Sequence, residues 1–174
     1  GDNGQLGHGS SAASSAPKLV AALSGHRVAS AVCGSRCSAA VTATGQVYTW
    51  GAGGKHATGH TSTDDVHLPK LLPEFDGTCA SKTAVQVALG YGDAHGLVVT
   101  QDGAVWSFGS NTKNQLGRPG AQTQTPAVVN LDGHEAENVF CGDGWSAVLT
   151  TTGQIFTWGV NDANQLGTAR AGSS

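Results

Sequence analysis

Three segments of the chain repeat one short pattern, and this repetition constrains the fold more than any other feature. The pattern is a glycine, a variable residue, a β-branched residue, an aromatic residue, Ser or Thr, a second aromatic residue and a final glycine. It occurs as GQVYTWG at 45–51, GAVWSFG at 103–109 and GQIFTWG at 153–159. Sequence periods of about 20 to 50 residues are typical of solenoids and propellers.

A second motif follows each aromatic segment and ends on a glycine, and a further copy opens the chain. Three of these copies end in Gln-Leu-Gly, and one has lost that signature. The closing glycines are 52, 58 and 50 residues apart. Landmarks that recur in constant order indicate a repeat array rather than a chance match. The copies are GDNGQLG, the degenerate GKHATG, NTKNQLG and NDANQLG, which end at Gly7, Gly59, Gly117 and Gly167.

Each repeat carries the sequence signals of β-strands. The aromatic segments are rich in β-branched and aromatic residues, and a short apolar run ending in Thr precedes each of them. A short turn that closes on glycine joins the two, which is typical of an antiparallel hairpin. With a third strand upstream, the expected strands are 28–34, 38–42 and 45–51, then 84–90, 96–100 and 103–109, and finally 137–142, 146–150 and 153–159.

A proline marks the start of a fourth expected strand in each repeat. These segments are PKLV at 17–20, PKLL at 69–72 and PAVV at 126–129. Proline has no N–H for the sheet ladder, so it is tolerated at the start of an edge strand. Four short strands in about 50 residues are the signature of a propeller blade.

The sequence therefore predicts an all-β fold of propeller blades with four antiparallel strands each, about three blades of an incomplete or fragmentary propeller. Asn114 and Asn164 stand where Gly4 stands in the opening copy, so we expect a positive φ at both. The repeat turn residues are Gly45, Gly51, Gly103, Gly109, Gly153 and Gly159. The expected units are 1–7 as the end of a preceding repeat, blades at 8–59, 60–117 and 118–167, and a tail at 168–174.

These motifs resemble the repeats of the regulator-of-chromosome-condensation family, over about residues 1 to 167. Blades of that family carry a glycine–aromatic strand ending in Trp-Gly, then an Asn…Gly-Gln-Leu-Gly turn, then a Pro-Val strand. WD repeats match less well because the chain has no Trp-Asp pair, and kelch repeats because no double glycine ends a strand. The resemblance implies a closed seven-bladed propeller, of which this chain holds about three blades.

An arc of three blades would expose two apolar blade faces that a closed ring buries. The chain also lacks methionine and starts inside a repeat motif. We therefore expect part of a larger propeller, with association of chains to complete the ring as the alternative. The middle repeat departs most from the pattern, because its turn is degenerate and it has a longer loop between Gly59 and Gly90. Such insertions tend to lie on one face and to carry partner contacts.

No sequence pattern indicates catalysis or a cofactor. GAGGKH lacks the spacing and the Ser or Thr of a phosphate-binding loop, GxSxG is absent, and His134–Glu135 lacks the second His of a zincin. The net charge of −3 argues against a nucleic-acid footprint, and no apolar run is long enough to span a membrane. The aromatic residues lack interleaved Arg or Lys, which favours packing over base stacking. They are Tyr48, Trp50, Trp106, Phe108, Phe156 and Trp158.

One histidine cluster has residue types that suit zinc, and we weigh it against a structural interpretation. The residues are His56, His60, His67, Asp64 and Asp65. Their spacing would bring the ligands together only on a helix, whereas this region is rich in glycine. We therefore interpret it as a solvated loop and predict no metal site.

The cysteines are interpreted as reduced thiols of a cytosolic or nuclear protein, since no pair has CxxC spacing and the chain is not cysteine-dense. Cys33 and Cys141 occupy one repeat position, which Leu89 fills in the middle repeat. Replacement by leucine indicates buried filler rather than a ligand or a nucleophile.

Four residues are candidates for contact with a partner protein. Tyr91, Asp93, Asp143 and Trp145 lie in the turns that follow the Leu-Gly and Cys-Gly strand ends. A propeller places such turns near one rim. Buried packing is the alternative interpretation for Tyr91 and Trp145.

The resemblance implies two functions of different classes. The first is a non-enzymatic protein-interaction scaffold or adaptor, part of a larger protein or complex, inside the cell in the cytoplasm or nucleus, including a cytoskeletal or ciliary assembly. The alternative is guanine-nucleotide exchange on a small GTPase, which needs differential affinity rather than side-chain chemistry. Neither function calls for a cofactor, direct nucleic-acid binding or a membrane. Only 12% of residues are charged, as expected of a surface that is partly covered.

Overall fold

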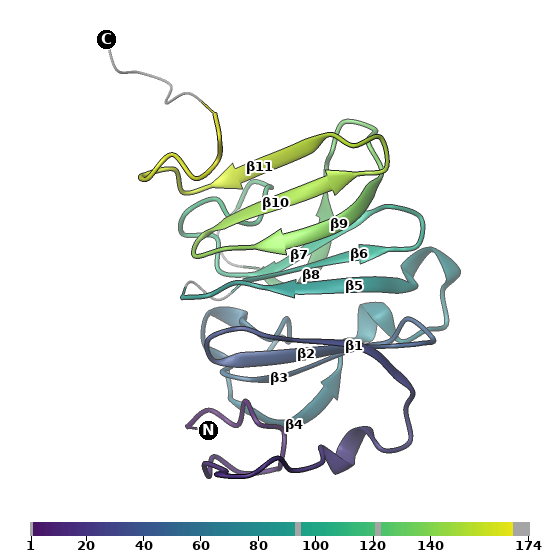
Figure 1. The fold of residues 1–174 in the computed structure, drawn as a ribbon, viewed down its shortest axis with the longest axis vertical. Helices are drawn as coiled ribbons and strands as arrows, with labels where there is room; N and C mark the ends of the chain where they lie inside the picture. Colours follow the sequence, from purple (N-terminus) through teal and green to yellow (C-terminus); the bar gives the residue numbers. More distant parts are fainter. Residues whose placement is uncertain (1, 93–94, 121–122, 169–174) are drawn as a thin grey trace.

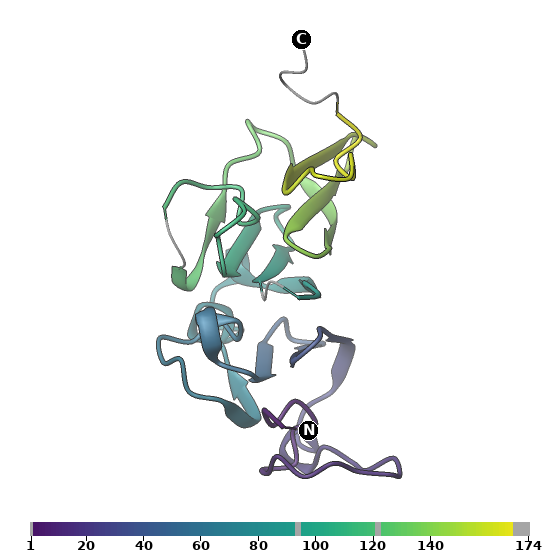
Figure 2. The same cartoon turned by 90° about the vertical axis from the view of Figure 1, so that its left-hand side faces the viewer.

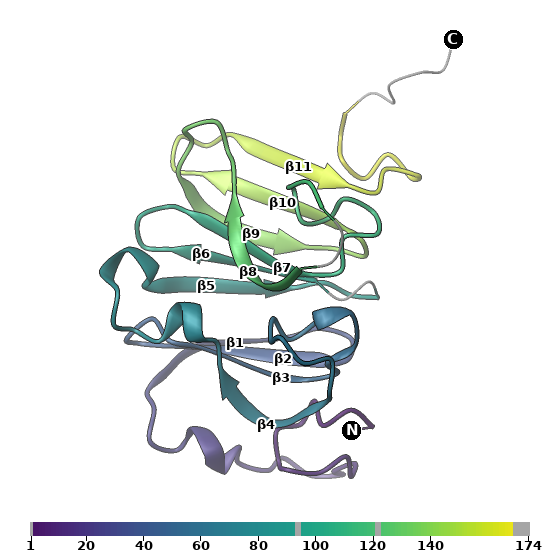
Figure 3. The same ribbon diagram turned by 180° about the vertical axis from the view of Figure 1, so that it is seen from behind.

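The chain folds into three antiparallel β-sheets that follow one another as blades of an arc (Figure 1). The computed structural model describes residues 2–92, 95–120 and 123–168. Figure 2 shows the sheets stacked in sequence order, and Figure 3 shows β4 and β8 on the side that faces the viewer. The strands are β1 (Val28–Cys33), β2 (Cys37–Thr42), β3 (Val47–Gly51), β4 (Val66–Leu71), β5 (Ala84–Leu89), β6 (His95–Thr100), β7 (Val105–Gly109), β8 (Thr123–Val129), β9 (Ala136–Cys141), β10 (Trp145–Thr150) and β11 (Ile155–Gly159).

The helices of the described residues are single 3₁₀ turns in the connections between strands. None of them is long and apolar enough to cross a membrane. The predicted all-β class is therefore confirmed. The helices are η1 (Ala21–Leu23), η2 (Gly54–His56), η3 (Pro73–Phe75) and η4 (Ala80–Lys82).

Each sheet is an antiparallel meander, and the turn positions agree with the sequence analysis. The strand orders are β1-β2-β3-β4, β5-β6-β7-β8 and β11-β10-β9. The positive φ values expected at the turns are confirmed, because glycine and asparagine accept this conformation at low cost. They are 78°, 78° and 81° at Gly45, Gly103 and Gly153, 111°, 98° and 108° at Gly51, Gly109 and Gly159, and 60° at both Asn114 and Asn164.

The proline-containing strands close the outer edges of the first two sheets. Pro69 lies in β4 and Pro126 in β8, each at a point where the register with the neighbouring strand shifts. A missing N–H at such an irregularity removes no regular ladder bond. The prediction of a strand at 17–20 was wrong, since these residues form no strand. β4 and β8 each pair with an aromatic–glycine strand earlier in the chain, whereas residues 17–20 pair with no strand in the described part of the chain.

The sheets are offset from the sequence periods. The first sheet spans 28–71 and the second 84–129. Each therefore takes its last strand from beyond the closing glycine that ends a period at 59 or 117. The offset arises because the chain reverses direction at the turn that ends on this glycine. The outer strand, β4 or β8, then pairs antiparallel with the strand before the turn, β3 or β7.

Apolar side chains from facing sheets interdigitate to form two cores. The first core joins the first sheet to the second, and the next joins the second sheet to the third. Burial of such surface is the main stabilising contribution. The first core contains Val41, Val47, Leu72, Phe75, Val87, Val98 and Phe108, and the second contains Leu97, Val99, Val105, Val129, Val139 and Val148.

At two places along the arc, two side chains donate hydrogen bonds to the same main-chain carbonyl oxygen. We call each of these groups a clamp. In each clamp, a serine hydroxyl and a tryptophan indole donate to the carbonyl oxygen of the glutamine in a Gln-Leu-Gly turn. The aromatic residues thus pack between elements, as the sequence predicted. The donors are Ser38 and Trp50 to Gln5 O, both at 2.9 Å, and Ser146 and Trp158 to Gln115 O, both at 2.8 Å.

The seam between the first and second sheets has lost this clamp on both sides. Gly96 and Phe108 stand where serine and tryptophan stand in the other repeats, and Ala57 replaces the glutamine. Phe108 is fully buried, and its ring lies so close to Gly96 that a Cβ there would overlap it. Apolar packing therefore replaces the hydrogen bonds at this seam. The first and second sheets stay in contact although the turn that ends at Gly59 lacks the Gln-Leu-Gly sequence.

The residue after the closing glycine ties its turn to the sheet. His60, which is 5% exposed, lies with Nε2 3.1 Å from Thr49 Oγ1. The Thr49 hydroxyl donates to Thr58 O at 2.6 Å, so the His60 Nε2–H donates to Thr49. Arg118 occupies the same repeat position and donates from Nε to Ser107 Oγ at 2.8 Å.

We expect the free energy of unfolding to fall as the pH decreases from about 6.5 to about 4. Burial, and then Lys70, lowers the pKa of His60 from 6.5 to about 4. The unfolded chain therefore binds more protons than the folded chain in this interval, and folding weakens as the pH falls through it. The expected loss is about 2 kcal/mol.

Chemical denaturation at pH 7 and at pH 4.5 measures this loss. The control variant His60→Gln keeps a side-chain N–H near Thr49 but does not titrate, so its stability should depend less on pH over this range. A pH dependence in His60→Gln as steep as that of the wild-type protein would assign the effect to another group.

Candidate functional site

The turns between the first two strands of each blade lie side by side along one rim. A Cβ built on Gly34 would lie 3.0 Å from Gly90 O, and one built on Gly90 would lie 3.1 Å from Gly142 O. Successive turns of the three sheets thus approach each other at their glycines. The rim is therefore one continuous surface made of equivalent positions in successive repeats.

Two of the predicted contact residues come together on this rim. Tyr91 is 70% exposed, and Asp143 is exposed on the next turn. The Asp143 carboxylate lies so close to Gly92 that a side chain at Gly92 would overlap it. Asp93 falls outside the described residues.

Trp145 belongs to a different surface from Tyr91. Its indole lies against Gly142, where an added Cβ would overlap it, and it starts β10. From there it faces a hollow of about 450 Å³ on the outer face of the third sheet, beside Phe140 and Ile155. Spacing along the sequence predicted one rim for both aromatic residues, and the structure separates them.

That outer face is apolar and uncovered in the described residues. Phe140 is 50% exposed and Ile155 is 71% exposed. The same face of the first sheet is covered by the second sheet, and that of the second sheet by the third. Among the described residues, the hollow is therefore an uncovered apolar blade face.

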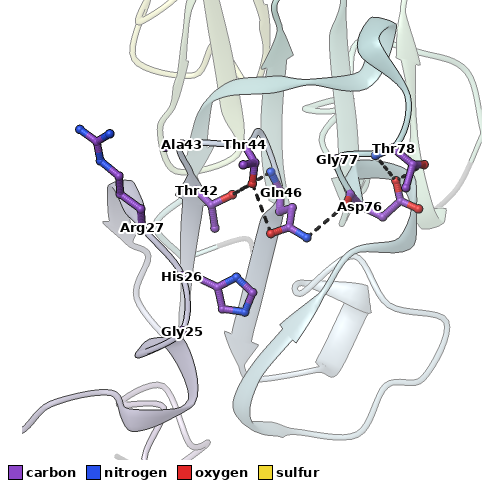
Figure 4. Close-up of a pocket in the computed structure, with 10 residues that line it drawn as sticks. All are labelled: Gly25, His26, Arg27, Thr42, Ala43, Thr44, Gln46, Asp76, Gly77 and Thr78. Carbon is purple, nitrogen blue, oxygen red and sulfur yellow. Dashed lines mark hydrogen bonds between the residues drawn. The ribbon is translucent and has the colours of Figure 1, made fainter.

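A polar hollow of about 420 Å³ lies at the opposite end of the first sheet (Figure 4). The turn between β2 and β3, which we call the first hairpin turn, forms one wall, and in it Thr42 Oγ1 lies 2.9 Å from Thr44 Oγ1. The side-chain amide of Gln46 donates to Asp76 O at 3.1 Å. The hydroxyl of Thr78 and its backbone N–H lower the pKa of Asp76 by hydrogen bonding to its carboxylate.

The polar network of this hollow is a feature of the repeat. The third hairpin carries the same bonds, since Thr150 Oγ1 lies 3.0 Å from Thr152 Oγ1 and accepts from Gln154 N at 3.0 Å. Threonine and glutamine at these positions therefore close the turn. The bond from Gln46 to Asp76, which anchors the inserted loop, is an addition in the first hairpin.

The histidine cluster is partly buried, which corrects the solvated-loop interpretation at His60. Asp65 accepts from Asn3 Nδ2 at 2.9 Å and from Gly53 N at 3.1 Å. Hydrogen bonding by Asn3 lowers the Asp65 pKa, and a backbone bond to Gly53 contributes. No three His, Cys, Asp or Glu side chains in the part of the chain that the structure describes are placed to hold a metal ion.

The shared cysteine position is only partly buried, which corrects the buried-filler prediction. Leu89 is buried, Cys141 is half-buried and Cys33 is exposed. The side chain at this position packs toward the preceding sheet, as Leu89 does in the core with Cys37. No described sheet precedes β1, so Cys33 remains uncovered. Burial raises the pKa of the Cys37 thiol to about 11, and burial also raises that of Cys141.

One serine–histidine pair has the separation of a catalytic dyad, and sequence reasoning did not single it out. His95 Nε2 lies 3.0 Å from Ser146 Oγ, and neither residue is exposed. The Ser146 hydroxyl donates its hydrogen to Gln115 O at 2.8 Å. Because that hydrogen is engaged and the pair is sealed between two sheets, it is a structural joint and not a nucleophile with its base.

Comparisons with known proteins agree with the blade geometry. The family profile for the regulator of chromosome condensation (RCC1) repeat matches residues 1–41, 44–95 and 102–149. The chain is 39% identical over 148 residues to the human E3 ubiquitin-protein ligase HERC2, covering 82% of this chain and 3% of HERC2. It is 36% identical over 118 residues to the Arabidopsis thaliana ultraviolet-B receptor UVR8, covering 67% of this chain and 26% of that protein.

Solved propellers have the same arrangement of sheets. The crystal structure of human WBSCR16 aligns with a TM-score of 0.69 and 29% identity, covering 77% of this chain and 33% of that one. Prp20p from Saccharomyces cerevisiae aligns with a TM-score of 0.68 and 25% identity, covering 83% and 33%. The chain thus spans a third or less of the relatives and structures compared. With three tandem profile matches that together span most of the three sheets, the chain belongs to the regulator of chromosome condensation (RCC1) repeat family.

Proposed function

We propose that the chain is a non-enzymatic protein-interaction module that acts as a scaffold or adaptor within a larger protein or assembly inside the cell. The observation that carries this proposal is the rim, where Tyr91 and Asp143 stand exposed on adjoining turns of a rigid sheet array. Exposed aromatic residues beside polar groups are typical of the residues that dominate binding energy at protein interfaces. The serine–histidine pair at hydrogen-bond distance, Ser146 and His95, is buried between two blades.

Substitution of Tyr91 by Ala should weaken binding of the partner protein by tenfold or more, and Asp143→Ala should weaken it less. The reason is that Tyr91 offers a large exposed aromatic surface, and truncation of such anchors typically costs about 2 kcal/mol or more. Co-purification from the source cell identifies the partner, and calorimetric titration with that partner measures the affinity.

The thermal midpoint of both variants should stay within about 2 °C of the wild-type value, because exposed side chains contribute little to stability. A midpoint lowered by several degrees would instead identify Tyr91 as a packing residue. Thr61→Ala, at an exposed position of another loop, serves as the matched surface control and should leave both affinity and stability unchanged.

A second candidate function is guanine-nucleotide exchange on a small GTPase. The observation that favours it is the likeness to Prp20p, whose structure is described together with its binding to Gsp1p and histones. Exchange requires no catalytic side chain in this chain, only stronger binding of the nucleotide-free state. Release of a fluorescent guanine nucleotide from candidate GTPases tests it. No acceleration by the protein over the spontaneous rate would remove this candidate.

A further inference from the structure

Several departures from the repeat pattern converge on one hollow in the rim. The hollow has a volume of about 510 Å³ and lies where the turns of the first and second sheets meet. The degenerate turn borders it on one side, and the lengthened turn that contains Tyr91 borders it on the other. Its lining residues are Ser35, Arg36, Ala52, Gly54, Lys55 and Gly92.

The degenerate turn has exchanged its usual side-chain bond for contacts with the inserted loop. In the third repeat, Asn161 Oδ1 accepts from Leu166 N at 3.1 Å and so closes the turn. Gly53 stands at the position of Asn161 and donates its own N–H to Asp65 Oδ1 at 3.1 Å. The carbonyl of Asp64 crosses the place where a side chain at residue 53 would lie. The loop at 61–65 thus sets the shape of this turn.

The backbone at Lys55 departs from the repeat as well. His56 has a φ of 55°, close to the 60° of Asn114 at the equivalent position, but Lys55 adds a second positive φ of 56° directly before it. Two consecutive non-glycine residues in the left-handed region are strained and persist only where the surrounding structure holds them. Such outliers concentrate at binding and active sites.

The equivalent space at the next seam is filled. There Lys113, at the position of Lys55, lies with Cδ 2.7 Å from where a Cβ on Gly144 would be. Gly92 is the middle-repeat counterpart of Gly144, and among the described residues both Gly92 and Lys55 line the hollow. In the described part of the chain, the Lys113 side chain thus occupies at one seam a place that borders a hollow at the other.

Cationic side chains gather at this hollow in a chain whose net charge is −3. Arg36 and Lys55 are both exposed, and Ser35 adds a hydroxyl. Guanidinium groups form strong paired hydrogen bonds with carboxylates. Tyr91 is 70% exposed and directly precedes Gly92 in the wall of the hollow.

We propose that this hollow binds the carboxylate of an Asp or Glu side chain in a segment of the partner protein, with Tyr91 packing beside that segment. This inference rests on the proposed interaction function. A side-chain carboxylate is the anionic group that a segment of a partner protein carries, and the planar guanidinium of Arg36 can pair with both of its oxygens.

Titration of the ¹⁵N-labelled protein with a hexaglutamate peptide tests the proposal. The backbone amide shifts should change at residues 34–36 and 52–56, and binding should weaken with added salt. Arg36→Glu and Lys55→Glu should each raise the dissociation constant about tenfold or more. The matched control is Arg27→Glu, an exposed cation at the polar hollow on the other end of the sheet, and it should not change the affinity.

Two results would overturn the assignment. In one, Arg27→Glu weakens hexaglutamate as much as Arg36→Glu does, which would mean general charge attraction. In the other, inorganic phosphate binds at 34–36 and 52–56 more tightly than the peptide, which would make the hollow a phosphate site. Hexaglutamine, which has the same length without charge, should produce no shifts.

The same variants separate this proposal from the function on which it rests. If the partner from the source cell is lost with Tyr91→Ala but kept with both Arg36→Glu and Lys55→Glu, the rim remains an interaction surface and the carboxylate site is refuted. If the partner is kept with all of these variants, the rim function is refuted, whatever the hexaglutamate titration shows.

Discussion

Replacement of Phe75 by Ala is expected to lower the free energy of unfolding by about 4 kcal/mol. Phe75 belongs to η3 in the inserted loop, is completely buried, and is part of the core between the first two sheets. Its ring meets Trp106 edge-on, with centroids 5.5 Å apart and an interplanar angle of 82°. Truncation leaves a cavity that the strands on either side cannot close, so the cost is the lost burial plus the cavity.

The size-matched control for this substitution is Tyr91→Ala, which removes an aromatic ring that is 70% exposed and should change stability by less than about 0.5 kcal/mol. Urea denaturation followed by tryptophan fluorescence measures both variants, since Trp106 reports on the site directly. A Phe75→Ala loss no larger than that of Tyr91→Ala would mean that the inserted loop is not anchored by the core.

The strands could be identified from the sequence because each repeat must satisfy the same backbone requirements. Asn114 and Asn164 stand where Gly4 stands, and these residue types, which tolerate a positive φ, mark the turn by their identity alone. The same argument could not find His56, which adopts a φ of 55°, since histidine is not a residue whose presence indicates this conformation. The packing of the surrounding loop, and not local preference, holds it there.

The sequence period did not predict that the last strand of each sheet comes from beyond the glycine that closes a repeat. A period can be cut at any point, and residues 17–20 match the proline strands in composition. Whether they form a strand depends on a neighbour to supply the ladder, which composition does not encode. Cys33 shows the same limit for burial, because its repeat position is buried only where a preceding sheet covers it.

The candidate site was only partly accessible to sequence reasoning. Tyr91 could be singled out because it lies in the turn that follows a Leu-Gly strand end, and the structure leaves it exposed on the rim. The sequence does not single out Arg36 and Lys55, since charged residues in turns usually face solvent and have no binding role. A usable signal was present, however, because the degenerate turn and the lengthened loops fall in adjacent parts of one repeat. When departures from a repeat pattern lie close together in the sequence and the fold places them at the contact between two sheets, they indicate a candidate binding site.

Gly53→Ala is expected to lower the free energy of unfolding by about 3 kcal/mol, although alanine suits the αR conformation of Gly53, with φ −86°. The methyl group would meet the Asp64 carbonyl, so the loop at 61–65 must move and the bond from Gly53 N to Asp65 is lost. The neighbouring Gly54 is the matched control, because a Cβ there would meet no atom of the described residues within 4 Å. Gly54→Ala should therefore be neutral or slightly stabilising, as expected when the unfolded chain loses freedom without strain in the folded state. Equal thermal midpoints for the two variants would show that the loop does not cross Gly53 in solution, and the rim hollow that this crossing shapes would lose its structural basis.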